Sequence, residues 1–392
     1  MRLAIVTRRF WPIAGGAERA IASLAAELVA RSVAVTVITV QWEANWPDRI
    51  DYRGVRVLRL PRRGKGFLGT RRWLRNLSLH MRDNAGRYDA VYVCGIRQDS
   101  HVVLKAVRRW GVVVLRAEGS GQTGDCLWQL ESAGGRKIKR LALKADAFVG
   151  PTEISHRELI AAGYPRDRIH RIVGGVAVPD PADLSVKLAA RSALEGVNTL
   201  LHCPPKTPVA VYTGSLDEWT GPATAIDAWR LVTERWPSAR LWLVGAEANQ
   251  SQLNRRIEKA GLTGRVVIPG VFADVTELLA AADVAIIGDD LPESLALLLE
   301  AMAAGLPVAA ADRPEHRSVL DDGTLARLYP PGGSDVLGRI LVDLCGDAGQ
   351  ASSVGAAARA HVEQNYSIGK VADDHLRLLE NLVRRKRKPS QS

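Results

Sequence analysis

The sequence has few cysteines, and those it has are isolated. Cys94, Cys126, Cys203 and Cys345 include no Cys-x-x-Cys pair and no metal-ligand spacing. Four separate thiols in a chain of 392 residues fit a reducing compartment better than a disulfide framework. We therefore expect a cytoplasmic protein with no metal site.

Long apolar runs are also lacking. No stretch approaches the ~20 apolar residues that span a bilayer. The best candidate, residues 295–311, contains Glu300, Gly305 and Pro307, so it is predicted to be a buried helix followed by a strand. The opening MRLAIVTRRF has a short apolar run that Arg8 and Arg9 interrupt, and it does not resemble a signal peptide.

What the chain does have is a globular composition and an excess of positive charge. It is 47% hydrophobic and 24% charged, and its length suits two hydrophobic cores better than one. The net charge of +11 favours polyanionic partners such as nucleic acid, anionic lipid or phosphorylated small molecules, or else a solvated arginine-rich surface. No nucleic-acid-binding module or interleaving of basic and aromatic residues is present, so we expect no nucleic-acid partner.

Short apolar strands alternate with helices in two consecutive blocks. Residues 2–6 and 33–40 flank a helical pattern, and both strands are apolar throughout, which is typical of a parallel sheet covered on both faces. Further strands are predicted at 89–94, 112–116, 146–149, 208–213, 240–244, 265–268, 284–287 and 307–310. Two α/β domains with Rossmann-like parallel sheets follow from this order, with ligands at the carboxyl ends of the strands.

The domain boundaries are predicted from changes in composition. Residues 1–178 form the first domain, and residues 179–206, which contain four prolines, form a linker. Residues 207–366 form the second domain. Residues 367–392 form a final helix, which we expect to pack against one of the domains, and a basic tail.

Two glycine-rich loops after strands of the first domain are candidate binding segments. Gly15 and Gly16 precede a helix, where backbone N–H groups and the helix dipole favour an anion, although such a pair also serves tight turns. The second loop carries Arg116, Glu118 and Asp125 around three glycines, and it is either a ligand-binding loop or a long flexible connection.

The segment around Glu300 is the strongest candidate. After the strand that ends at Ile287 come Asp289, Asp290 and Glu293, and then a helix in which Glu300 lies among leucines and Met302. A carboxylate buried among apolar side chains is unfavourable unless it is hydrogen-bonded. We expect Glu300 either to accept hydrogen bonds from sugar or ribose hydroxyls or simply to face water.

In this segment and others the chain resembles glycosyltransferase family 4, a group of retaining enzymes with the GT-B fold. The resemblance spans nearly the whole chain. It rests on the segments 15–19, 145–153, 163, 174–176, 214–221, 244–245, 281–284 and 293–307.

The resemblance implies an activity and a set of site residues. A sugar would pass from a UDP- or GDP-linked donor to a glycan or lipid-linked acceptor with retention of configuration and without a metal or other cofactor. Glu300 would hold the ribose, and Glu293 the donor sugar. The diphosphate would meet Gly15 and Gly16, together with the segment from Gly214 and Ser215 to Thr220. Arg116, Glu118 and Asp125 would face the acceptor.

The chain departs from the family pattern at the donor site. Ser215 and Thr220 stand where the family usually has Arg and Lys, and Glu293 is seven positions before Glu300 instead of eight. Because cations stabilise the charge that develops on the leaving group, their loss favours an alternative, a weak or inactive relative that binds a nucleotide, glycan or partner enzyme. Arg8, Arg9 or Arg116 are candidates to replace them. The absence of a G-x-G-x-x-G before a helix argues against a nicotinamide-dependent oxidoreductase.

A basic amphipathic helix near residues 62–82 suggests a membrane partner. One face carries Trp73, Leu74, Leu77 and Met81, and arginines flank it. Such a helix lies at a lipid headgroup boundary or docks on its own domain. The net charge favours the first alternative, peripheral contact with an anionic membrane surface on its cytoplasmic side.

Overall fold

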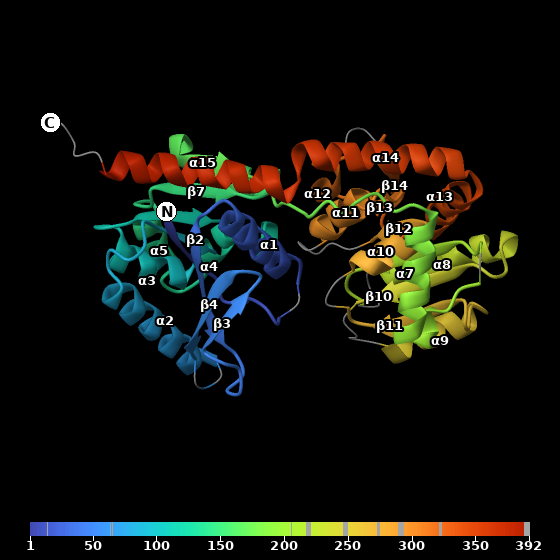
Figure 1. The fold of residues 1–392 in the computed structure, drawn as a ribbon, viewed down its shortest axis with the longest axis horizontal. Coiled ribbons are helices and arrows are strands. Elements are labelled where there is room, and N and C mark those ends of the chain that lie inside the picture. The colour runs from blue at the N-terminus through green and yellow to red at the C-terminus, as the bar shows by residue number, and fades with distance from the viewer. Residues whose placement is uncertain are drawn as a thin grey trace. The chain divides into compact units, whose positions relative to one another are not determined.

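The computed structural model comprises two compact units (Figure 1). The first contains Met1–Gly175 and Ile368–Ser392, and the second contains Val176–Ser367. The structure describes the chain except residues 14, 63, 65, 205, 217–220, 246–249, 273–274, 289–293, 321–323 and 388–392. In the described residues, no helix is both long and apolar enough to cross a bilayer.

The first unit is built on an eight-stranded sheet in the order β3-β4-β2-β1-β5-β6-β7-β8. All neighbouring strands pair in parallel except β3 and β4, which are antiparallel. The strands are β1 (Arg2–Val6), β2 (Ala34–Gln41), β3 (Arg49–Tyr52), β4 (Val55–Pro61), β5 (Ala90–Cys94), β6 (Val112–Arg116), β7 (Ala147–Gly150) and β8 (Ile169–Arg171). The central strands are buried on both faces, which explains their continuous runs of Val, Ile and Leu.

Helices cover both faces of this sheet. On one face α1 (Gly16–Ala30) and α15 (Ile368–Arg387) share an apolar core with the strands. On the other face α2 (Gly66–Asp83), α3 (Gln98–Val107) and α5 (Gly135–Ala142) build a second core. Two further helices, α4 (Asp125–Glu131) and α6 (Glu153–Ala161), follow β6 and β7.

The second unit has a six-stranded, wholly parallel sheet in the order β11-β10-β9-β12-β13-β14. Its strands are β9 (Val209–Thr213), β10 (Arg240–Val244), β11 (Val266–Gly270), β12 (Val284–Ile287), β13 (Val308–Ala311) and β14 (Arg327–Tyr329). Its helices are α7 (Leu184–Val197), α8 (Gly221–Arg235), α9 (Gln250–Lys259), α10 (Thr276–Ala281), α11 (Ser294–Ala303), α12 (Pro314–Arg317), α13 (Ser334–Gly346) and α14 (Ala348–Asn365). The predicted fold class, two α/β domains with parallel sheets, is confirmed.

Residues 179–206 differ from the expected linker. They contain α7, which belongs to the second unit, and Arg191 of this helix donates to the carbonyl of Ala281 and to Asp283. Prolines at 179, 181, 204 and 205 flank this helix without entering it. The proline-rich composition therefore marked the ends of a helix as well as a connection.

Helix α2 presents to its own domain the face that was expected to contact a membrane. Trp73, Leu77 and Met81 are fully buried in the core, and the indole N–H of Trp73 donates to Asp99 Oδ1 at 2.8 Å. The expectation that this face lies at a lipid boundary is therefore wrong, and the docked alternative holds for it. The apolar side chains that α2 does expose are Phe67, Leu68 and Leu79.

The final helix α15 docks on the first unit through polar contacts along its length. Arg31 of that unit donates to Asp373 and to the carbonyl of Gly369. Near the other end, Lys386 contacts Asp146 at 3.0 Å and Arg387 contacts Asp89 at 2.7 Å. The chain therefore returns to its first unit after completing the second.

A buried histidine anchors the middle of α15. His375 Nδ1 donates to the carbonyl of Val371 at 2.8 Å, which leaves Nε2 to accept from the hydroxyl of Tyr92 on β5 at 3.0 Å. Burial lowers the pKa of His375 to about 4. The imidazole is therefore neutral near pH 7.

The orientation of α2 can be tested with a matched pair of leucines on that helix. Leu77 is 0% exposed and Leu79 is 44% exposed. We expect Leu77→Ala to lower the free energy of unfolding by about 2–5 kcal/mol, because it leaves a cavity in the core. Leu79→Ala should change it by less than about 0.5 kcal/mol. Urea denaturation measures both, and equal effects would contradict this orientation.

The neutral state of His375 predicts a pH dependence of stability. The unfolded chain binds a proton near pH 6.5 and the folded chain only near pH 4, so the contribution is complete above pH 6.5 and lost as the pH falls towards 4. We expect a loss on the order of 3 kcal/mol over this interval that is absent from His375→Gln. Other histidines are present in both proteins, so parallel curves of unfolding free energy against pH would refute this assignment.

Candidate functional site

Each sheet has one position where the order of its strands reverses, and there the carboxyl ends of two strands leave a crevice in this class of fold. In the first unit this switch point lies between β1 and β5. In the second it lies between β9 and β12. The segments that follow these four strands contain most of the residues singled out in the sequence.

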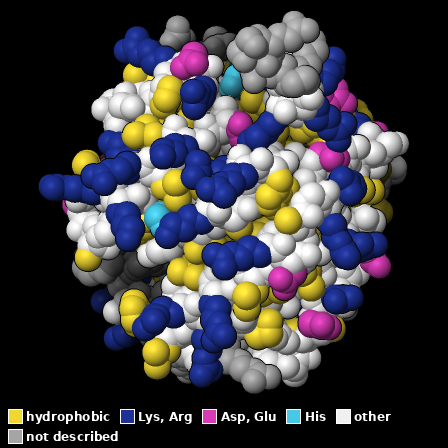
Figure 2. All heavy atoms as spheres, turned by 90° about the vertical axis from the view of Figure 1, so that its left-hand side faces the viewer, with side chains coloured by type: hydrophobic (Ala, Val, Ile, Leu, Met, Phe, Trp, Pro, Cys, Tyr) yellow, Lys and Arg dark blue, Asp and Glu magenta, His cyan; other side chains and the backbone are white. Residues whose placement is uncertain are grey.

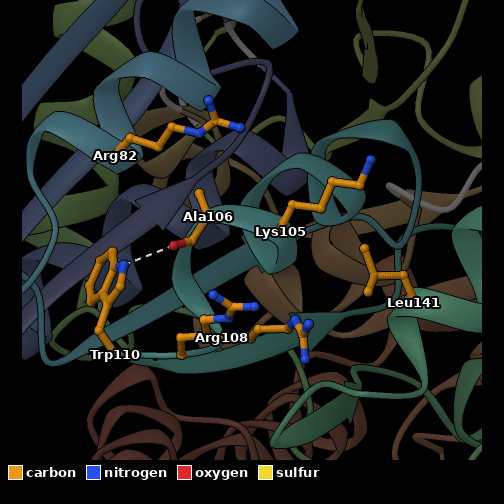
Figure 3. A pocket seen from close by; sticks show the side chains of 7 residues that line it. Arg82, Lys105, Ala106, Arg108, Trp110 and Leu141 are labelled. Carbon is orange, nitrogen blue, oxygen red and sulfur yellow. Dashed lines mark hydrogen bonds between the residues drawn. The ribbon is translucent and has the colours of Figure 1, made fainter.

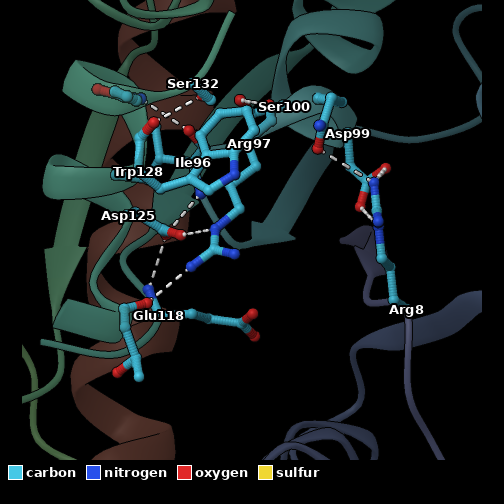
Figure 4. A network of polar contacts seen from close by, with 12 residues as sticks. Arg8, Ile96, Arg97, Asp99, Ser100, Glu118, Asp125, Trp128 and Ser132 are labelled. Atoms are coloured by element: carbon cyan, nitrogen blue, oxygen red, sulfur yellow. Dashed lines mark hydrogen bonds and ion pairs between the residues drawn. The ribbon is translucent and has the colours of Figure 1, made fainter. Parts of the chain in front are cut away.

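Beyond β1, the side chain of Arg8 is fixed by a carboxylate from the neighbouring helix α3. Its guanidinium donates to Asp99 through Nε at 2.7 Å and Nη2 at 3.1 Å (Figure 4). Asp99 is buried and also accepts from Trp73. Arg8 is therefore held at the strand ends, with its charge largely balanced by Asp99. Arg9, next to it, is exposed and forms no ion pair with a described residue.

Asp125 joins the loops that follow β5 and β6. Its carboxylate accepts from the backbone N–H of Ile96 at 2.7 Å and of Glu118 at 2.9 Å, and from Nε of Arg97 at 2.7 Å (Figure 4). The residue is 2% exposed. We expected Asp125 to face an acceptor. Its oxygens are instead occupied by donors of its own domain, so it positions the two loops.

The glycine-rich loop after β6 is ordered by these contacts and is not a flexible connection. Gly119 has φ +66°, and a Cβ there would lie 2.7 Å from the carbonyl oxygen of Thr123. Arg97 donates to the same carbonyl at 2.7 Å. A glycine is therefore required for the loop to fold back over Asp125.

Arg116 and Glu118 lie together at the end of β6. Arg116 Nη1 and Glu118 Oε1 are 3.9 Å apart, and the two side chains are 14% and 43% exposed. Loss of hydration raises the pKa of Glu118, and the nearby carboxylates of Asp125, Asp99 and Glu18 add to this increase while Arg116 opposes it. Glu118 thus has a partly exposed carboxylate and a raised pKa. This combination is common where a side chain exchanges protons or binds hydroxyl groups.

The start of α1 carries a negative charge of its own. Gly15 is the N-cap of the helix and Gly16 its first residue. A Cβ on Gly15 would lie 2.1 Å from Oε2 of Glu18, so this carboxylate folds over the Gly15–Gly16 segment. An incoming diphosphate would have to displace or share this position. With Arg8, Arg116, Glu118 and Glu18, the edge presents both signs of charge, which suits the hydroxyls of a sugar better than a bare anion.

In the second unit, glycines allow backbone segments near the strand ends to come into close contact. A Cβ on Gly221, the first residue of α8, would lie 2.7 Å from Cα of Gly288, and the reverse distance is also 2.7 Å. A Cβ on Gly245 would lie 1.9 Å from the carbonyl oxygen of Gly214. The start of α8 therefore lies directly at the β9–β12 switch point, where its free N–H groups favour an anion. Ser215 belongs to this segment, and its carbonyl accepts from Tyr212 at 3.3 Å.

Glu300 lies on the partly exposed side of α11. Leu297, Leu298 and Met302 around it are buried, whereas Glu300 itself is half-buried. Its neighbours one turn away along the same side, at i±4, are Ala296 and Ala304. Glu300 is therefore neither sealed in the core nor on an open polar face.

Two residues that we did not identify from the sequence fix the start of α11. His316 is fully buried, and its Nδ1 donates to the carbonyl of Ala311 at 2.7 Å. Its Nε2 then accepts from the hydroxyl of Ser294, the first residue of α11, at 3.0 Å. The sequence signal was a histidine five residues after the end of β13, which is too weak to interpret without the fold.

Glu293 and Thr220, together with Asp289 and Asp290, lie outside the described residues. Their expected roles stay predictions. Among the residues that are described, no three His, Cys, Asp or Glu side chains are grouped to hold a metal ion.

Comparison with known families assigns both halves of the chain. A model described as Glycosyltransferase Family 4 matches residues 14–178. A model described as Glycosyl transferases group 1 matches residues 207–347.

Curated relatives carry related activities. The phosphatidyl-myo-inositol mannosyltransferase of Mycobacterium leprae is 29% identical over 305 residues, which is 73% of this chain and 79% of that protein. A GDP-mannose-dependent monoacylated alpha-(1-6)-phosphatidylinositol monomannoside mannosyltransferase of Corynebacterium glutamicum is 26% identical over 61% of this chain and 63% of that protein.

Solved structures agree with the fold. A glycosyltransferase of Rickettsia africae superimposes with a TM-score of 0.78 at 16% identity, over 97% of this chain and 98% of that one. The HepE protein of Anabaena, solved with UDP and glucose, has a TM-score of 0.73 at 20% identity, over 97% of this chain and 100% of that one. The chain belongs to the group 1, family 4 glycosyltransferases and has their GT-B fold.

Proposed function

We propose that the chain transfers a sugar from a UDP- or GDP-linked donor to a glycan or lipid-linked acceptor, with retention of configuration and without a metal. The observation that carries the donor assignment is the pair of features at the β9–β12 switch point. The start of α8 reaches the end of β12 there, because Gly221 and Gly288 carry no Cβ, and Glu300 is half-buried on the side of α11 that carries two alanines. The curated relatives named for GDP-mannose and phosphatidylinositol support a nucleotide-sugar donor and a lipid-linked acceptor.

In this proposal the second unit holds the nucleotide. The carboxylate of Glu300 accepts hydrogen bonds from the ribose hydroxyls, which recovers the free energy lost when it is partly buried. The diphosphate lies against the backbone N–H groups at the start of α8, next to Ser215. These donors stabilise the negative charge that develops on the leaving nucleoside diphosphate. Glu293 contacts the donor sugar.

The first unit holds the acceptor in this proposal. Glu118 accepts a hydrogen bond from the acceptor hydroxyl, and Arg116 opposes the increase in its pKa that burial and the neighbouring carboxylates cause. Asp125 contributes indirectly, because it fixes the backbone at Ile96 and Glu118.

The alternative function is that of a relative that binds a nucleotide or glycan but transfers sugar weakly. Ser215 in place of the usual arginine favours it. The two functions share the donor site and differ in turnover. Release of UDP or GDP from sugar nucleotides in the presence of acceptor distinguishes them, and a chelator added to the same assay tests the absence of a metal.

The donor site is tested by Glu300→Ala against a matched control, Glu277→Ala, an exposed glutamate at the start of α10 in the same unit. Calorimetric titration with UDP, GDP and ADP should show binding of one nucleotide. We expect Glu300→Ala to weaken it by about 100-fold, because two charge-assisted hydrogen bonds are lost. The control should bind as the unchanged protein does.

Equal affinities of the two variants would remove Glu300 from the donor site. No binding of any nucleotide to the unchanged protein would refute the proposed donor altogether.

We further propose that the outer face of the α2–α3–α5 layer contacts an anionic membrane. Figure 2 shows this side of the molecule, where Lys and Arg side chains are spread widely and Asp and Glu are few. The cations of these three helices and the turn after α3 are Arg71, Arg72, Arg75, Arg82, Lys105, Arg108, Arg109, Arg136, Lys137, Lys139 and Arg140. Phe67 and Leu68, 75% and 68% exposed at the start of α2, supply apolar groups for the headgroup boundary.

The membrane contact is tested with phosphatidylglycerol vesicles. Phe67→Ser/Leu68→Ser should lower vesicle affinity about tenfold, because two apolar side chains no longer leave water. The matched control is Leu184→Ser/Leu188→Ser, which removes two exposed leucines from α7 in the second unit. Co-sedimentation at low salt measures both. Unchanged affinity of the first variant, or an equal decrease in the control, would contradict the proposed surface.

A further inference from the structure

A pocket of about 480 Å³ opens in the first unit among residues of this basic layer (Figure 3). Four cations line it: Arg82 from the end of α2, Lys105 from α3, and Arg108 and Arg109 from the turn after α3. Trp110, Ala106 and Leu141 complete its wall. The volume is within the range of small-molecule sites, about 300–1,000 Å³.

The four cations have no partner in the described part of the chain. No side-chain hydrogen bond or ion pair joins any of them to another described residue. By contrast, Arg8 is paired with Asp99 and Arg97 with Asp125 in the same unit. All four are exposed, so water screens part of their mutual repulsion. An anion bound among them would relieve the remainder.

Stabilisation of the helix end does not explain the cluster. A single cation at the carboxyl terminus of α3 would complement its dipole. Here Lys105, Arg108 and Arg109 all surround that terminus, and Arg82 is added from a different helix. The charge exceeds what the helix requires.

The pocket is separate from the proposed transfer site. Trp110 lies just before β6, at its amino end, whereas Arg116 and Glu118 lie at the carboxyl end of the same strand. The two sites thus occupy opposite edges of the sheet. A ligand in the pocket cannot reach Glu118, and the pocket is no part of the donor or acceptor site.

The wall of the pocket indicates more than a bare ion. The indole N–H of Trp110 donates to the carbonyl of Ala106 at 2.8 Å, so the ring is held in place within the wall (Figure 3). Leu141 of α5 adds an apolar surface. Guanidinium groups bind phosphate through paired hydrogen bonds, and the ring and leucine would contact an attached organic group.

We propose that this pocket binds a phosphate-bearing anion at a second site, independent of whether the chain transfers a sugar. The phosphate could belong to a lipid headgroup, since the pocket is continuous with the basic layer, or to a soluble phosphate compound. Both sources share the chemistry that the four cations recognise.

The test uses charge reversal in the full-length chain. Lys105→Glu/Arg108→Glu removes two cations of the pocket, and Arg82→Glu/Arg109→Glu is a second variant should the first fail to fold. The matched control, Lys259→Glu/Arg339→Glu, makes the same change in net charge at exposed positions of the second unit. Each protein is titrated with glycerol 1-phosphate and, separately, with phosphatidylglycerol vesicles.

The indole N–H resonance of Trp110, in the wall of the pocket, is followed in both titrations. This resonance, assigned with Trp110→Phe, should shift on addition of the bound phosphate compound. We expect a pocket variant to lose about tenfold or more in affinity while the control loses little.

Loss of glycerol 1-phosphate affinity identifies a soluble phosphate compound as a ligand, and loss of vesicle affinity alone identifies the headgroup. Unchanged affinity in both titrations overturns the proposal. So does an equal loss in the control, because net charge would then explain the binding.

Discussion

The parallel pairing of β1 with β5 and of β9 with β12 is the constraint on which the rest of the structure depends. It brings the loops after four strands to two sheet edges, where helix starts and loop backbones are free of strand partners. The glycines at 221 and 288 make this possible in the second unit, since any Cβ would force the two backbones apart. In the first unit the buried carboxylates of Asp99 and Asp125 hold the segments at the strand ends in place through hydrogen bonds.

The two edges differ in the chemistry they provide. The edge of the first unit holds carboxylates next to guanidiniums, which balances most of the positive charge, while loss of hydration raises the pKa of Glu118. The edge of the second unit offers the start of α8 and the half-buried Glu300. A diphosphate fits the second edge better, and a hydroxyl-bearing acceptor fits the first. On the side of the molecule where α2, α3 and α5 lie, Lys and Arg side chains are many and Asp and Glu are few (Figure 2).

The alternation of strands and helices predicted the fold well because buried parallel strands are apolar throughout. It missed β4, whose VRVLRLP alternates with arginines, and Arg59 there is buried between the carbonyls of Pro47 and Trp11. The membrane expectation for one face of α2 was also wrong. A face with Trp73 and Leu77 suits a core and a membrane equally well, and periodicity does not distinguish the two. Asp125 was selected for its charge, yet its partners come from loops nearly thirty residues away, which only the folded chain reveals.

The central claim is that the β9–β12 switch point is where the nucleotide binds. Hydrogen exchange of the backbone amides with and without a saturating sugar nucleotide tests it most directly. The account predicts slowed exchange at the starts of α8 and α11, with α9 of the same unit unchanged. Slowed exchange confined to the first unit, or none at the start of α8, would contradict it.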